Sequence, residues 1–230
     1  MKKWQKCFDC DQEFHGAVQL ALGWACWKTY RGRPVTDGTQ CQAMGALGGA
    51  LRSSGRCAEA IPVLEAELAL RRRHFSRSEQ GILGTIANLA NCHCDLGRDD
   101  EALALRREVY AGMVAVYGVS HERTILNGCN LGISLNNLAL WDEALPLLRQ
   151  LLPAARQLLG ADNDVTLDIK LNLAHVLYNV PESSRDDLLE AETIMQGVVQ
   201  RRRQVFGPAH PRTLLAERAL SRARAKLARA

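Results

Sequence analysis

The sequence has few aromatic residues, since Phe, Trp and Tyr together make up only 5% of its 230 residues. Because β-sandwiches and barrels are rich in aromatic and β-branched side chains, this scarcity argues against both. No stretch approaches the roughly 18 consecutive apolar residues that span a membrane. With 47% hydrophobic and 23% charged residues, and with Leu, Ala and Arg prominent, the composition predicts a globular helical chain.

The first residues do not resemble a secretory signal peptide, because Asp9, Asp11 and Glu13 stand where an apolar run is needed. Without such a signal, the eight cysteines indicate free thiols in a reducing compartment rather than a disulfide framework. We therefore expect a cytoplasmic protein with no membrane partner.

Positive charge is concentrated at one end of the chain. The formal net charge is only +4, yet residues 201–230 contain nine Lys or Arg residues and a single acid, Glu217. No aromatic residues alternate with these charges, which argues against nucleic-acid binding. The basic segment favours an acidic protein partner, and a merely solvated helix face is the alternative.

Three short markers recur with one period of 42 residues. The first is a three-residue motif of the form Asn-Leu-Ala, which begins at Ala46, Asn88, Asn130 and Asn172. The second is the pair Glu-Ala, which begins at Glu59, Glu101, Glu143 and, after a five-residue insertion, Glu190. The third, a large residue before Gly118, Gly160 and Gly207, includes the same insertion. A fixed period of this length predicts a solenoid of repeated units.

Each repeat divides into two helices with apolar residues at helical spacing. In the second repeat, Gly97 separates the two, and Asp99 suits the first turn of the second helix, where the helix dipole favours acids. Small residues recur in both helices and would let them approach closely; these are Gly48, Ala90, Gly132 and Ala174, with Ala60, Ala102, Ala144 and Ala191. The predicted fold class is all-α, a right-handed α-solenoid of stacked helix pairs.

The pattern resembles the tetratricopeptide repeats of kinesin light chains, whose units run close to L-G-x-x-H-P-x-T-L, then N-L-A and G-(K/R)-Y-x-E-A-E. Residues 206–214 match the first motif almost fully, and Asn88-Leu89-Ala90 with Gly97-Arg98 matches the others. The resemblance implies about four repeats, at 38–78, 79–120, 121–162 and 163–209, followed by a capping helix at 210–229. It also implies a structural role for His121 and His210.

Several positions depart from that pattern. Ala139 occupies the place of the turn glycine, and Asn163 occupies the place of the linker histidine. Pro153 falls inside a predicted helix, where we expect it to kink or break the helix.

Residues 1–37 do not repeat. We interpret 1–15 as the remnant of a zinc-finger-like segment, because Cys7 and Cys10 form a Cys-x2-Cys pair that resembles the last ligands of a RING or RING-CH finger. The pair is incomplete: the alternatives are two free thiols, or zinc held with help from His15 or another chain. Cys92-His93-Cys94 points in different directions on a helix and is expected to be ordinary packing. Residues 16–37 are expected to form an N-terminal capping helix and linker, with Trp24 and Trp27 packed on the first repeat.

The resemblance implies that the first helix of each pair lines a concave face where peptides bind. Amides suit that task because they donate and accept hydrogen bonds, although they could equally join neighbouring helices. The predicted groove residues are Asn88, Asn91, Asp95, Asn130, Ile133, Asn136, Asn137, Asn172, His175, Tyr178, Asn179, Arg218, Arg222 and Lys226.

Function is therefore expected to be binding rather than catalysis, because no nucleophile, phosphate-loop or metal-hydrolase motif is present. The favoured prediction is a non-catalytic scaffold that binds peptide segments of partner proteins, without a small-molecule substrate or cofactor. The alternative is the substrate-recognition part of a RING-CH-type ubiquitin ligase, with zinc at Cys7 and Cys10.

Overall fold

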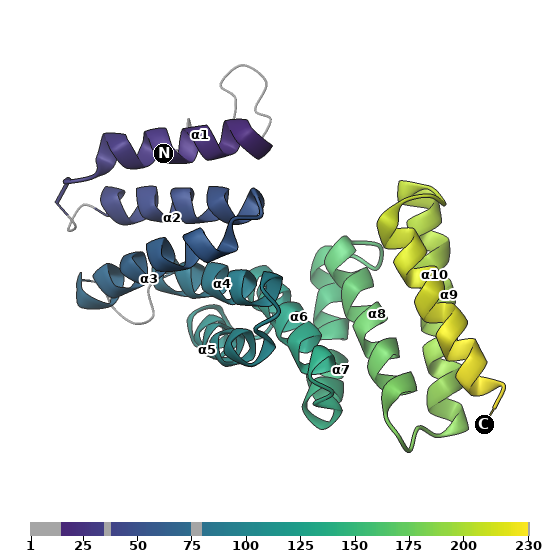
Figure 1. Cartoon of the computed structure of the whole chain (residues 1–230). Helices are drawn as coiled ribbons and strands as arrows, with labels where there is room; N and C mark the ends of the chain where they lie inside the picture. Colours follow the sequence, from purple (N-terminus) through teal and green to yellow (C-terminus); the bar gives the residue numbers. More distant parts are fainter. Residues whose placement is uncertain (1–14, 35–37, 75–79, 230) are drawn as a thin grey trace. The chain divides into compact units, whose positions relative to one another are not determined.

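The computed structural model describes residues 15–34, 38–74 and 80–229, and in these ranges it contains ten helices and no strand (Figure 1). The chain divides into two compact units, Met1–Val116 and Tyr117–Ala230. The first unit holds α1 (Gly16–Tyr30), α2 (Thr39–Ser53), α3 (Cys57–His74), α4 (Gln80–Asp95) and nearly all of α5 (Asp99–Tyr117). The second unit holds α6 (Glu122–Asn137), α7 (Trp141–Leu159), α8 (Asp164–Asn179), α9 (Arg185–Phe206) and α10 (Pro211–Leu227).

Helices pack as the repeat predicts. The first helix of each pair contacts the second, as in α2 with α3, α6 with α7 and α8 with α9. First helices of successive pairs also touch, because α2 contacts α4, α6 contacts α8 and α8 contacts α10. The groove positions of the first helices in one unit are thereby brought next to each other.

Small residues set the spacing inside each pair. A Cβ atom on Gly48 would lie 2.5 Å from Cδ2 of Leu64, and one on Gly132 would lie 2.7 Å from Cδ2 of Leu148. The recurring alanines of the second helices are completely buried; they are Ala60, Ala102, Ala144 and Ala191. The expectation that these positions permit close approach is confirmed.

The linkers before the first helices share one local structure. Nδ1 of His121 accepts a hydrogen bond from the backbone N–H of Arg123, and Nδ1 of His210 does the same for Arg212. Asn163 replaces the histidine in sequence and replaces it in function as well, because its side-chain oxygen accepts from the N–H of Val165. These three residues cap helices α6, α8 and α10, which confirms a structural role for the linker histidines.

Two expectations about individual helices are wrong in part: no break occurs at Pro153, and Trp24 is exposed while Trp27 is half-buried. Pro153 does not break its helix, since α7 continues to Leu159; the proline is exposed, so the carbonyl that it leaves unpaired can face water. In α1 the buried residues are Gly23 and Cys26, whereas Trp24 is 39% exposed. A Cβ on Gly23 would lie 2.9 Å from the Cβ of Ala50, so the close contact with α2 selects the side with the smallest residues.

Candidate functional site

The second unit contains a groove of about 280 Å³ formed by α6, α8 and α10, which we call the C-terminal groove. Several of its lining residues belong to the predicted set. The complete lining is Asn136, Asn137, Leu171, Asn172, His175, Tyr178, Leu215, Arg218, Ala219 and Arg222. The groove therefore contains amides, an imidazole, a phenol and two guanidinium groups, and no acidic side chain.

Most amides around this groove already bond within the protein. The side-chain N–H group of Asn136 donates to the backbone oxygen of Asn172 at 3.1 Å, which joins α6 to α8. Asn172 in turn donates to the backbone oxygen of Asp168, and Asn179 donates to that of His175. Asn137 is exposed and no hydrogen bond ties its amide to another described residue. Asn137 is thus the lining amide best placed to meet a ligand.

The side chains of His175 and Tyr178 form the floor of the groove. Their rings meet edge to face with centroids 5.0 Å apart. Burial lowers the pKa of His175, and the positive charge of Arg222 lowers it further. The imidazole is therefore held neutral at physiological pH, so the positive charge of this groove comes from Arg218 and Arg222.

These two arginines differ from most of the other arginines of the C-terminal segment. Arg202, Arg203 and Arg224 pair with Asp168, Glu217 and Glu192. Arg201 and Arg212 pair with Asp162 and Asp164. Neither Arg218 nor Arg222 has an acidic partner among the described residues, and both line the C-terminal groove. The third predicted base, Lys226, is used differently, because its Nζ donates to the carbonyls of Tyr178 and Val180 at the end of α8.

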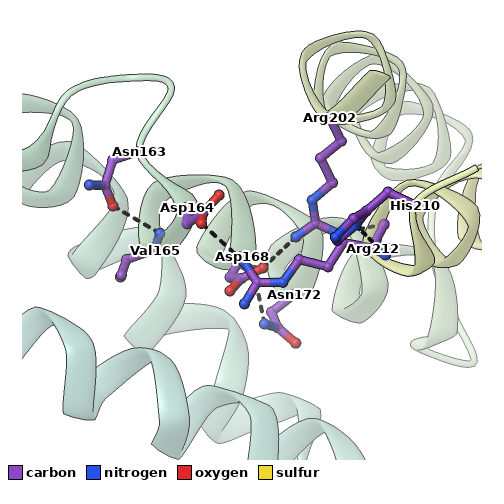
Figure 2. A network of polar contacts seen from close by, with 8 residues as sticks. All are labelled: Asn163, Asp164, Val165, Asp168, Asn172, Arg202, His210 and Arg212. Carbon is purple, nitrogen blue, oxygen red and sulfur yellow. Dashed lines mark hydrogen bonds and ion pairs between the residues drawn. The ribbon is translucent and has the colours of Figure 1, made fainter. Parts of the chain in front are cut away.

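A polar network fixes α10 against α8 and so positions the two arginines (Figure 2). Arg202 reaches from α9 to the carboxylate of Asp168 on α8, and it also donates to the backbone oxygen of Arg212 at 3.1 Å. Arg212, at the start of α10, donates to Asp164 at 3.0 Å. Burial raises the pKa of Asp168, while the charges of Arg202 and Arg212 oppose that rise.

The first unit has its own polar groove of about 280 Å³, between α1, α2 and α4. Its lining includes Asn88, together with Gly45, Gly49 and Arg52, so one wall has almost no side chains. Asp95 lies at the end of α4, where it pairs with Arg52 at 3.5 Å. Of the remaining predicted groove residues, Asn91, Asn130 and Ile133 are all half-buried on α4 and α6.

The predicted metal ligands Cys7 and Cys10 lie outside the described residues, so the zinc hypothesis and the ligase alternative stay predictions. Within residues 15–34, 38–74 and 80–229, no three His, Cys, Asp or Glu side chains are placed to hold a metal ion. In the same ranges the cysteines are free thiols, and burial raises the pKa of Cys92 to about 12. A thiol this hard to ionise is unreactive, as expected for packing.

Family models of the tetratricopeptide repeat match residues 43–77, 82–123, 129–164 and 182–212, which together exceed half of the chain. The chain belongs to the tetratricopeptide-repeat family. The all-α solenoid predicted from the 42-residue period, and the tetratricopeptide repeats that the motif resemblance implied, are therefore confirmed. Among the described residues, no helix is long and apolar enough to cross a membrane.

Solved structures agree with this assignment. A kinesin-light-chain protein of Podosopora anserina with nearly identical TPR-like repeats has a TM-score of 0.67 and 19% sequence identity, covering 86% of this chain and 90% of its own. BtubC (BKLC) from P. vanneervenii has a TM-score of 0.65 and 15% identity over 92% of this chain and 87% of its own. A Rap protein complexed with Competence and Sporulation Factor has a TM-score of 0.58 and 16% identity, over 92% of this chain and 60% of its own. None of the curated proteins matches the chain in sequence.

Proposed function

We propose that this chain is a non-catalytic scaffold, and that its C-terminal groove binds an acidic peptide segment of a partner protein. Tetratricopeptide repeats generally serve as protein-interaction modules, and the similar Rap protein was solved in complex with Competence and Sporulation Factor. The observation that carries the proposal is the pair Arg218 and Arg222, which lack acidic partners in a groove without acids.

A bound carboxylate would complete the charge balance of this groove. The two arginines lie four residues apart on α10, so both guanidinium groups project from the same helix face. Each can donate two parallel hydrogen bonds to one carboxylate. The exposed Asn137 would then grip the peptide backbone, and Leu171 and Leu215 would contact an apolar side chain beside the acid.

Fluorescence anisotropy with a labelled octapeptide of alternating Glu and Leu tests the proposal. We expect the double variant Arg218→Gln/Arg222→Gln to bind about tenfold or more weakly, because two charge-assisted contacts are lost. Binding should also weaken as salt is raised. The matched control is Arg224→Gln, which removes a charge from α10 at a position already paired with Glu192.

The octapeptide with Gln in place of Glu is the ligand control and should bind poorly. Equal loss of affinity in the Arg224 variant would mean that only net charge matters. Unchanged affinity in the double variant would show that the acidic segment binds elsewhere.

A further inference from the structure

A second pocket in the same unit lies at the turns between helices and shares no lining residue with the C-terminal groove. It has a volume of about 380 Å³. Its walls are residues 139–143, at the turn into α7, and Val180 and Pro181, at the turn after α8. We call it the turn pocket.

The turn pocket is apolar where the corresponding turns of other repeats are polar. One period earlier, Gly97-Arg98-Asp99 stands where this turn has Ala139-Leu140-Trp141. In the first repeat the turn is Gly55-Arg56-Cys57, and Arg56 there pairs with Glu59 at 2.6 Å. Leu140 instead presents an apolar side chain that is 36% exposed. The opposite wall, Val180 and Pro181, is also apolar and lies where the loop with the five-residue insertion begins.

Three adjacent residues of this turn each have a locally unfavourable feature. Ala139 has a φ of 56°, and it is the sole non-glycine residue with positive φ in the described ranges. Leu140 is the N-cap of α7 but makes no side-chain capping bond, whereas the other four helices of the second unit, α6, α8, α9 and α10, all have one. The indole Nε1–H of Trp141 is shielded from solvent and has no hydrogen-bond partner.

Each irregularity disfavours the folded state. A missing cap leaves backbone N–H groups of the first turn without a partner, and a buried donor without a hydrogen bond has lost its contact with water and gained nothing in return. Natural proteins tend to break local rules in this way at functional sites. The coincidence of three in consecutive residues, beside an open apolar pocket, marks the turn as a binding site rather than a poorly optimised loop.

We infer that the turn pocket binds an extended, proline-containing segment of a partner protein that carries an adjacent Lys or Arg. Prolines and aliphatic side chains fit between Leu140 and Pro181, and a Trp ring is the usual surface on which polyproline segments dock. Such segments leave their backbone carbonyls unpaired, and one of these can accept from the indole of Trp141 once the ring turns toward it.

The charge of the turn pocket selects the flanking residue. Asp142 and Glu143 are the charged residues of its lining, and no basic side chain joins them. Asp142 is exposed and has no ion-pair partner among the described residues. A cation beside the prolines can therefore pair with Asp142, while an acidic segment is repelled. The turn pocket and the C-terminal groove thus favour ligands of opposite charge, and this inference does not rest on the proposed function.

The test is an NMR titration of the whole chain, uniformly labelled with nitrogen-15, that follows the indole N–H signals. The probe is a capped hexapeptide, Pro-Pro-Leu-Pro-Pro-Arg, and the spectrum of Trp141→Phe assigns the signal of Trp141. We expect this signal to shift and saturate, while the indole signals of Trp24 and Trp27 stay in place. Replacing the final Arg by Glu should weaken binding severalfold, because the ion pair with Asp142 is lost.

The informative variant is Leu140→Arg/Trp141→Asp, which installs the turn residues that the second repeat already uses and is expected to fold normally. Its titration is followed through the backbone N–H signal of Val180, which lines the pocket in both proteins. It should bind the hexapeptide about tenfold or more weakly, since the apolar anchor and its donor are removed. Arg224→Gln, which lies in neither lining, is the matched control and should leave hexapeptide binding intact. No shift of the Trp141 signal at millimolar hexapeptide, an equal shift with a Gly-Ser peptide, or unchanged affinity in the double variant would overturn the inference.

Discussion

Replacing Ala139 by glycine is predicted to stabilise the protein. The residue is exposed and sits at φ 56°, while its counterparts one and two periods earlier, Gly97 and Gly55, have φ of 71° and 75°. This turn therefore requires a residue in the left-handed backbone conformation, and in the third repeat that residue is an alanine. A Cβ atom in that conformation crowds the following carbonyl oxygen.

The size of the effect follows from two opposing terms. Relieving the left-handed strain contributes about 1–2 kcal/mol. The greater conformational freedom of glycine in the unfolded chain reduces this stabilisation by roughly 0.5–1 kcal/mol. We expect Ala139→Gly to raise the free energy of unfolding by about 0.5–1 kcal/mol. For a chain of this length, that corresponds to a rise in Tm of roughly 1–4 °C.

The reciprocal change, Gly97→Ala, is the matched control. A Cβ on Gly97 would meet no atom within 4 Å, so its cost is that of the backbone alone. We expect destabilisation of similar size and opposite sign.

Urea unfolding followed by circular dichroism measures both variants, with the m-value checked for each, because arrays of repeats can unfold in steps. Hydrogen exchange of the amides at the start of α7 locates the gain. If Ala139→Gly is neutral while Gly97→Ala is destabilising, the strain assigned to Ala139 is absent. If both variants are neutral, positive φ carries no measurable cost at these turns.

Three further predictions concern packing, buried charge and pH. Gly48→Ala should destabilise the chain by about 1–3 kcal/mol through its clash with Leu64. The neighbouring Gly49→Ala, whose new Cβ meets no atom within 4 Å, should stabilise it by roughly 0.5–1 kcal/mol. Thermal unfolding that ranks the two variants alike would contradict the packing argument. Arg202→Leu should lower the free energy of unfolding, measured in urea, by roughly 2–3 kcal/mol, because it leaves the carboxylate of Asp168 without its partner. Breaking a fully buried ion pair costs more, and the loss is smaller here because Asp168 stays partly exposed. Because burial lowers the pKa of His175 in the folded state, its contribution to stability is complete above the unfolded value of about 6.5. That contribution is lost as pH falls from there through the lower pKa of the folded state. His175→Gln should flatten the loss of stability measured between pH 7.5 and 5.5, and an unchanged slope would refute this.

The repeat markers predicted the helix pairs because each helix has a narrow apolar stripe and a fixed small residue. The same reasoning failed for α1, which is apolar on nearly every side, so its sequence does not indicate which side is buried. The replacement of the linker histidine by Asn163 seemed a departure in sequence. In space it conserves the cap, since both side chains offer an acceptor at the same distance along the chain.

The site was predictable only in part. Register alone placed Asn136, Asn172, His175 and Arg222 on one face, and the structure brings them into one groove. Register could not tell that Asn136 is already bonded to α8, or that Lys226 caps that helix, because both contacts join residues far apart in sequence. The turn pocket was missed for the same reason: it exists only where two turns 40 residues apart in sequence lie side by side.

The difference in sequence between the turns of successive repeats also bears on how such a chain can acquire new partners. In a stack of duplicated units each copy touches only its neighbours, so a changed turn affects one copy while the others keep the fold intact. The Gly97-Arg98-Asp99 turn and the Ala139-Leu140-Trp141 turn occupy the same place in two successive repeats. The first has the glycine that a left-handed turn favours, and the second has apolar residues in the following positions without loss of the helix pair. Duplication thus supplies spare positions on which recognition can evolve without a new fold.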